Sequence, residues 1–171
     1  MDILNRGGFK ATEFAGIEPN PRIESVEEGV RLCKENEIDV ILAVGGGSMI
    51  DCCKAIAAGV FYEGDDLWAM VKSADHLRKA LPLVDVLTLS ATGSEFDGGG
   101  VISNMKTREK LGGLYTYPAV SICDPTYTFT VPAYQDRGGF RRYHEPYFRR
   151  LFFADGRQRP FRRNRRNNPL G

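Results

Sequence analysis

Residues 38–51 read Ile-Asp-Val-Ile-Leu-Ala-Val-Gly-Gly-Gly-Ser-Met-Ile-Asp. The apolar run predicts a strand of the buried parallel type over 38–44, and a helix is predicted over 48–59. Glycine lets a backbone approach a ligand closely, and a helix N-terminus offers unpaired N–H groups and the positive end of a dipole. The stretch therefore favours a phosphate-binding turn, although three glycines after a strand are also typical of a plain tight turn.

The segments around this stretch alternate between strand and helix patterns. Strands are predicted over residues 11–17, 83–89 and 120–123, and helices over 25–36 and 66–74. Ser25 and Glu28 have the spacing of a capping box, which places the start of the first of these helices. Residues 101–104 and 111–115 suit a short hairpin. The alternation predicts an α/β fold in which a parallel sheet carries helices on both faces.

A second loop rich in hydroxyl groups follows the predicted strand 83–89. Thr88 stands at the end of this strand and Thr92 in the loop, and ligands of open α/β sheets lie beyond the C-terminal ends of the strands. The alternative is a loop whose hydroxyls stabilise its own turns. In the first loop Ser48 can cap the helix or bond a phosphate, and Asp51 follows one turn later. Two such loops favour a dinucleotide over a single phosphate.

Charge is distributed unevenly along the chain. Residues 1–135 carry 12 basic and 19 acidic side chains, whereas residues 136–171 carry 11 basic and 3 acidic, and all 11 are arginine. The four cysteines form no CxxC motif, which favours reduced thiols in a cytoplasmic protein. No apolar run reaches the roughly 18 residues that a membrane span requires, so no membrane association is expected.

Five motifs in order resemble the iron-containing (group III) alcohol dehydrogenases, with the butanol dehydrogenases as the most similar branch. They are Gly45–Ala57, Ala91–Glu95, Gly100–Asn104, Glu109–Gly112 and Asp124–Pro132. The resemblance implies a Rossmann-like cofactor domain of the dehydroquinate synthase-like/iron alcohol dehydrogenase fold. It also implies NAD(P) as cofactor, and hydride transfer with a primary alcohol or aldehyde such as butanol or butanal. Zinc-dependent glycerol dehydrogenase and dehydroquinate synthase are weaker alternatives on the same fold.

The resemblance assigns roles to individual positions. It implies that the glycines and Ser48 form the turn that binds the pyrophosphate, and that an aspartate lies beside the cofactor. It also implies that two threonines line the dinucleotide and that a lysine reaches toward its ribose. The cofactor residues so implied are Gly45, Gly46, Gly47, Ser48, Asp51, Thr88, Thr92 and Lys110. A homodimer is a further expectation.

The metal site of the family cannot be carried over to this chain. The family holds iron, or another divalent metal, with one aspartate and three histidines of a helical C-terminal domain. This sequence has two histidines, His76 and His144, and the polar surroundings of His76 favour a surface position. The chain therefore lacks the metal ligands, and we expect it to be an inactive fragment that lacks the helical metal domain.

The sequence leaves the family pattern directly after Gln135. The family continues approximately Thr-Ala-Ala-Gly-Phe-Ala-Asp-Ile-Met-Ser-His-Ile-Phe, whereas residues 136–148 read Asp-Arg-Gly-Gly-Phe-Arg-Arg-Tyr-His-Glu-Pro-Tyr-Phe. One nucleotide sequence encodes both peptides at all thirteen positions, in reading frames one base apart. Arg142 and Pro146 stand where the family has its first metal-binding aspartate and histidine. We therefore predict a frameshift in the gene or in its sequencing.

These observations divide the chain into three parts. Residues 1–10 do not resemble the strand–loop–helix unit with which the family begins, residues 11–135 form a partial NAD(P)-binding domain, and residues 136–171 are an arginine-rich, out-of-frame and disordered tail. Two alternatives stay open: a non-catalytic dinucleotide-binding remnant, and a protein whose basic tail binds polyanions. No specific nucleic acid is expected as a partner, and we predict marginal folding.

Overall fold

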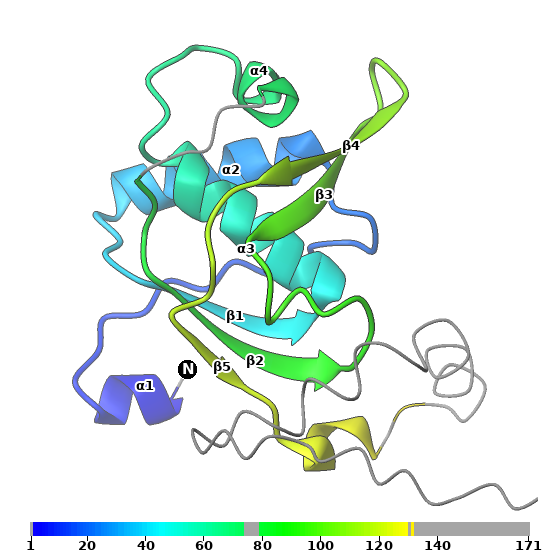
Figure 1. Cartoon of the computed structure of the whole chain (residues 1–171). Coiled ribbons are helices and arrows are strands. Elements are labelled where there is room, and N and C mark those ends of the chain that lie inside the picture. Colours follow the sequence, from blue (N-terminus) through cyan, green and yellow to red (C-terminus); the bar gives the residue numbers. More distant parts are fainter. Residues whose placement is uncertain (1, 74–78, 130, 132–171) are drawn as a thin grey trace, which may run out of the picture.

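The computed structural model describes residues 2–73, 79–129 and 131 (Figure 1). Its helices are α1 (Asp2–Arg6), α2 (Ile23–Glu35), α3 (Gly47–Gly59), α4 (Leu67–Lys72) and the 3₁₀ helix η1 (Pro125–Thr128). Its strands are β1 (Ile41–Gly46), β2 (Leu83–Leu89), β3 (Gly99–Asn104), β4 (Glu109–Leu114) and β5 (Val120–Ile122). In this part of the chain, no helix has the length and apolar character that a membrane crossing requires.

A parallel sheet of three strands in the order β1–β2–β5 forms one layer of the fold. Ile41 pairs with Leu83, and Val84 pairs with Val120. The parallel direction requires a crossover between β1 and β2, and α3 supplies it. The predicted parallel α/β sheet is confirmed, and β2 has the predicted bounds.

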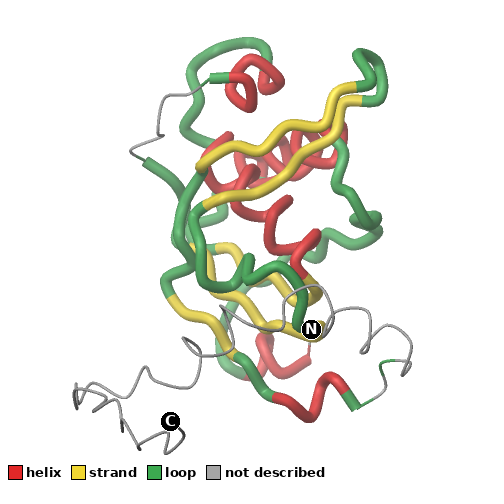
Figure 2. Tube along the Cα trace, turned by 45° about the vertical axis from the view of Figure 1, so that its right-hand side comes forward, coloured by secondary structure: helices red, strands yellow, loops and turns green. Residues whose placement is uncertain are grey.

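Helix α3 lies between the sheet and the antiparallel hairpin β3–β4 (Figure 2). Toward the sheet, Ile50 and Cys53 pack with Ala43, Leu83 and Leu87. On its other side, α3 packs in the larger core cluster, which joins buried residues of α2, α3, α4 and β3. The helix is buried on both sides, because residues 52–59 are small or apolar apart from one lysine.

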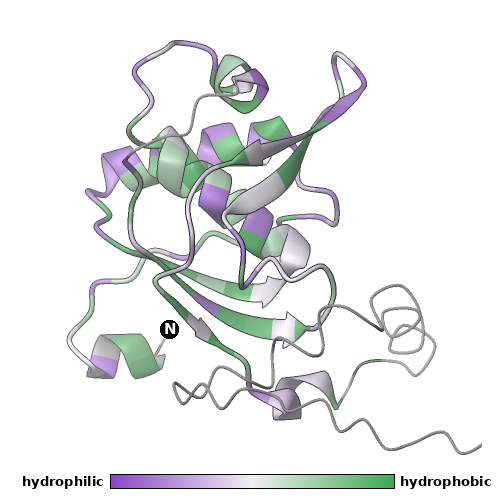
Figure 3. Cartoon of the chain, viewed as in Figure 1, coloured by the Kyte–Doolittle hydropathy of each residue, from purple (hydrophilic) through white to green (hydrophobic). Residues whose placement is uncertain are grey.

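Contrary to the sequence-based expectation, the other face of the sheet is open in the described part of the chain. Side chains of β1 and β5 on this face are 43–54% exposed, namely Leu42, Val44, Val120 and Ile122. Figure 3 shows the apolar colour of these strands. Besides α3, the described helix with the most contacts to the sheet is the short 3₁₀ helix η1, which touches β2 but buries none of its own residues. The expected helical layer on this face is therefore not formed by the described residues.

Two predictions of local structure were also wrong. Residues 11–17 form no strand, and instead Phe14 and Ile17 pack against the core from an irregular segment. The Ser25–Glu28 capping box does not form, because α2 already begins at Ile23 after Arg22, which makes no side-chain cap. Long-range contacts fix this start: residue 22 forms a β-bridge with Ser103, whose N–H donates to the Pro21 carbonyl at 2.8 Å.

Candidate cofactor-binding site

The glycine loop joins the C-terminal end of β1 to the N-terminal end of α3 without a gap. Gly45 and Gly46 are the last residues of the strand, while Gly47 and Ser48 are the first of the helix. Gly46 is the N-cap, so no side chain caps the helix, and the first turn contains no acidic residue. The first N–H groups of a helix lack intrahelical acceptors and carry the positive end of its dipole. This end of α3 is therefore suited to an anion such as a phosphate.

The loop after β2 lies directly against the glycine loop. A Cβ atom built on Gly47 would lie 3.0 Å from the Ser94 Oγ and 3.1 Å from the Thr92 Oγ1. These two hydroxyls are 3.0 Å apart and hydrogen-bonded. Glycine at position 47 therefore permits this close approach without displacing either hydroxyl. The structure brings together the two loops that the sequence selected separately, with Thr92 at their contact.

Thr88 is placed differently from Thr92. It precedes the last residue of β2. Leu87 is buried beneath α3 and pairs with Gly45, whereas Gly46 pairs with Leu89, so the register shifts at Thr88. Thr88 therefore lies half-buried at the C-terminal end of the sheet, beside the glycine loop.

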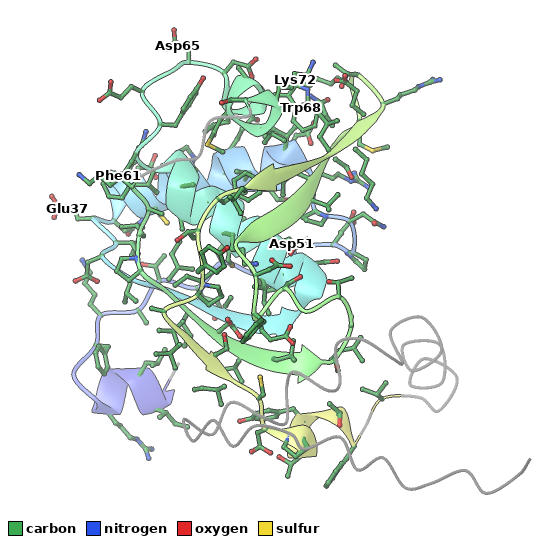
Figure 4. The ribbon with its side chains drawn as sticks, in the orientation of Figure 1. Glu37, Asp51, Phe61, Asp65, Trp68 and Lys72 are labelled. Atoms are coloured by element: carbon green, nitrogen blue, oxygen red, sulfur yellow. The ribbon has the colours of Figure 1, made fainter. Side chains whose placement is uncertain are left out.

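Asp51 lies one turn into α3 and faces the hairpin (Figure 4). Its Oδ2 accepts the Val101 N–H at 3.0 Å, while its Oδ1 is buried without a hydrogen-bond partner. Burial raises the pKa of Asp51, against the opposing effects of the Ser94 hydroxyl, the Val101 N–H and the Lys54 charge. The carboxyl thus joins the glycine-loop helix to β3.

Lys110 lies on β4, where its Nζ donates to the Asn20 Oδ1 at 2.6 Å. Both side chains are exposed, and Asn20 has a left-handed backbone with φ of 59°. Within the described residues, this lysine bonds to the turn before α2. None of its hydrogen bonds reaches the glycine loop.

Sequence reasoning did not select three residues that the structure places at the site. Ser94 is almost fully buried against Gly47, although it stood in the same hydroxyl-rich loop as Thr92. Lys54 is wholly buried and bonds to Asp97, which follows this loop. The signal for Lys54 was a lysine among the otherwise small or apolar residues 52–59 of the helix.

No metal centre is formed by the described part of the chain. Among residues 2–73, 79–129 and 131, no three His, Cys, Asp or Glu side chains lie close enough together to hold an ion. His76 and His144 lie outside the described residues, as do Arg142 and Pro146. The interpretation of His76 as a surface residue therefore stays a prediction.

The model of one protein family, iron-containing alcohol dehydrogenase, matches residues 1–125 of the chain. The chain belongs to the iron-containing alcohol dehydrogenase family. The matched range includes residues 1–10, to which the sequence motifs gave no family assignment. The resemblance that the five motifs indicated is confirmed.

Similar proteins agree with this assignment. The chain is 53% identical over 139 residues to the NADH-dependent butanol dehydrogenase A of Clostridium acetobutylicum, covering 80% of this chain and 36% of that protein. It is 40% identical over 143 residues to the NADPH-dependent aldehyde reductase of Escherichia coli, covering 81% and 36%. The chain thus spans about a third of the length of the curated relatives it matches.

The fold is that of a solved member of the family. The crystal structure of NADH-dependent butanol dehydrogenase A from Thermotoga maritima superimposes with a TM-score of 0.75 at 45% identity, covering 81% of this chain and 35% of that one. The predicted Rossmann-like α/β fold of the iron alcohol dehydrogenases is therefore confirmed for the described part of the chain.

Proposed function

We propose that residues 11–135 are part of the dinucleotide-binding half of an NAD(P)-dependent alcohol dehydrogenase. In the intact enzyme, hydride would pass between the nicotinamide and a primary alcohol or aldehyde such as butanol or butanal. One observation carries the proposal: the uncapped N-terminus of α3 lies against the Thr92–Ser94 hydroxyl pair, so closely that a Cβ atom on Gly47 would lie 3.0–3.1 Å from both oxygens. The printed names of the relatives, which include NADH and NADPH as cofactors, support it.

The residues present fit the diphosphate of such a cofactor. The N–H groups that begin α3 would donate to its oxygens, and Ser48 and Thr92 would add hydroxyl donors. Gly45, Gly46 and Gly47 would admit the diphosphate close to the backbone, while Asp51, Thr88 and Lys110 are proposed to complete the site. When bound, the nicotinamide supplies the atom that accepts or releases the hydride.

The residues present do not fit the metal of the family. The ligand set implied by the resemblance needs three histidines, and the sequence contains two. We therefore propose that this chain alone does not oxidise alcohols. In our proposal, residues 136–171 are out of frame with the family sequence that carries the first two metal ligands.

A frameshift after Gln135 accounts for the change of composition without assigning a function to the tail. The family match ends at residue 125, ten residues before this junction. The tail's charge, 11 arginines against 3 acidic residues, supports a second candidate, a polyanion-binding arm. Charge alone gives salt-sensitive binding to any DNA, so only sequence-selective binding at physiological salt would favour that candidate. The homodimer and the cytoplasmic location stay predictions.

Titration of the full-length chain with NADH and NADPH tests the dinucleotide site, with butanol dehydrogenase A of C. acetobutylicum as the positive control. We expect saturable binding by both proteins, and absence of binding to this chain would contradict the proposal. The same two proteins are assayed for butanol oxidation with added Fe²⁺. We expect turnover by the control alone, and iron-dependent turnover by this chain would contradict the proposed inactivity.

Sequencing of the DNA around codon 136 tests the frameshift. We expect the alternate frame to encode an Asp-x-x-x-His pair, which lies on one face of a helix. Reads that confirm the present frame, with no family sequence in the alternate one, would contradict it. In that case the tail would need a function of its own.

A further inference from the structure

Lys54 is a wholly buried lysine on the helix that carries the glycine loop. Its Nζ donates to the Asp97 Oδ1 at 2.8 Å and to the Gly99 carbonyl oxygen at 2.8 Å. A buried ammonium group strongly destabilises a fold unless it is paired and hydrogen-bonded. These two bonds therefore tie the 97–99 segment to α3.

The same segment is held to α3 at a second point. The Asp97 Oδ1 also accepts the Gly99 N–H at 3.0 Å, which fixes the turn around the lysine. Three residues before Lys54 on the helix, Asp51 accepts the Val101 N–H. Gly100 lies so close that a Cβ atom there would stand 3.1 Å from the Asp51 Cα. Asp51 and Lys54 share one helix face, and residues 97–101 run along it.

Lys54 acts on four carboxyl groups. Asp97 is bonded to it. Burial raises the pKa of the other three, Asp51, Asp85 and Glu95, and the positive charge of Lys54 opposes that rise. Among the described residues, no other cation acts on these three carboxyls. They come from α3, from β2 and from the loop after β2. The cluster thus places several acidic groups beside a site suited to an anion, and Lys54 offsets their charge.

We propose that Lys54 is a positioning residue for the dinucleotide: it clamps residues 97–99 to α3 and offsets the carboxylates that would repel the diphosphate. The inference rests on the proposed function. The clamp acts on the site through the chain, since the Thr92–Ser94 pair that contacts Gly47 precedes Asp97 by only a few residues. Lys54 itself has no hydrogen bond to the glycine loop.

The first test compares Lys54→Met with the matched control Lys72→Met, a half-exposed lysine on α4 that pairs with Glu109. NADH affinity of the full-length chain is measured from mildly acidic to mildly alkaline pH. We expect Lys54→Met to bind NADH about tenfold more weakly at alkaline pH, equal to about 1.4 kcal/mol. The loss should shrink as pH falls and the buried carboxyls take up protons. The control should follow the wild-type profile.

A second variant separates charge from packing and remains informative if Lys54→Met does not fold. Asp97→Asn keeps an oxygen acceptor for Lys54 and for the Gly99 N–H but removes one negative charge. We expect its NADH affinity to equal or exceed that of the wild type, by up to about threefold. If Lys54 acts only through its ion pair with Asp97, the affinity should fall instead, because that pair loses its negative charge.

The outcomes distinguish the two proposals. If the wild-type chain binds no NADH, both the proposed function and the role of Lys54 are overturned. If the wild type binds and Lys54→Met loses the same affinity at every pH, only the electrostatic role of Lys54 is overturned. A loss of affinity in Asp97→Asn would overturn it in the same way.

Discussion

A Cβ atom on Gly47 would lie 3.0 Å from the Oγ of Ser94, so a side chain there would have to displace the hydroxyls of the loop after β2. Ser94 is only 3% exposed, and its hydroxyl is already bonded to Thr92. The contact therefore fixes both the backbone of the turn and the direction of two hydroxyl groups. A ligand held by this turn would be bound by two loops at once.

Gly47→Ala should weaken NADH binding by about tenfold, because the new methyl group displaces Ser94 and Thr92 from the turn. Gly112→Ala is the matched control, since a Cβ atom there meets nothing within 4 Å. Calorimetric titration of both variants and the wild type checks this. Equal affinities for Gly47→Ala and the control would show that the hydroxyl pair does not contribute to binding.

Asp85 should make the stability of the fold fall as pH rises. It is fully buried, and burial raises the pKa of its carboxyl. As pH rises through the range between the ordinary carboxyl pKa and this raised pKa, the unfolded chain releases the proton first, so unfolding becomes easier. Above the raised pKa this cost stays constant. A tenfold difference in proton affinity is worth about 1.4 kcal/mol.

The hydrogen bonds of Ser121 suggest how Asp85→Asn would behave. The single hydroxyl of Ser121 lies 2.7 Å from the Asp85 Oδ2 and 2.7 Å from the Glu95 carbonyl oxygen. If a protonated Asp85 donates to Ser121, the serine can donate to Glu95. Asparagine can donate in the same way, so Asp85→Asn should flatten the pH dependence of urea denaturation. Glu13→Gln, an exposed position, is the control, and an unchanged slope in Asp85→Asn would contradict the prediction.

Gly29 and Ile56 should be coupled in stability. Gly29 of α2 has no room for a Cβ atom, because the Ile56 side chain of α3 occupies that position. Gly29→Leu should destabilise the fold by about 2 kcal/mol or more, and Ile56→Ala in the same chain should recover part of this loss. Denaturation of the two single variants and the double variant measures the coupling. Additive effects would mean that the two helices do not pack as described.

The four cysteines, all free, should differ in reactivity. Cys123 is exposed, whereas Cys52 and Cys53 are buried in α3, and burial raises the pKa of Cys53 to about 12. Alkylation followed by mass spectrometry should modify Cys123 about 100-fold faster than the two buried thiols. Denaturant should remove the difference. Equal rates in native buffer would support the prediction of marginal folding instead.

The sequence was most informative where local pattern and tertiary structure agree. The apolar run 83–89 became β2 with the predicted bounds, and the hairpin formed one or two residues from its expected limits. The expected start of α2 at Ser25 failed, because pairing of residues 21–22 with Ser103 decides where that helix begins. A capping motif reflects only the local preference for a helix start. Here the contact with Ser103, about eighty residues away, determines the start instead.

The candidate site was predictable to a similar degree. The glycine motif and the rule that ligands lie beyond the C-terminal strand ends placed Gly47 near the Thr92 loop, as the structure has them. The pairing of Lys54 with Asp97 and of Lys110 with Asn20 joins residues 43 and 90 positions apart. Such pairs depend on how helix and hairpin pack, which a single sequence does not reveal.

The aliphatic side chains that β1 and β5 leave half-exposed among the described residues have a consequence for the fate of the chain in a cell. Chaperones and degradative proteases recognise exposed apolar strands in newly made polypeptides, and a chain that keeps such a surface after folding continues to be recognised. Its steady-state abundance would then be governed by the valines, leucine and isoleucine of the uncovered strands rather than by cofactor supply.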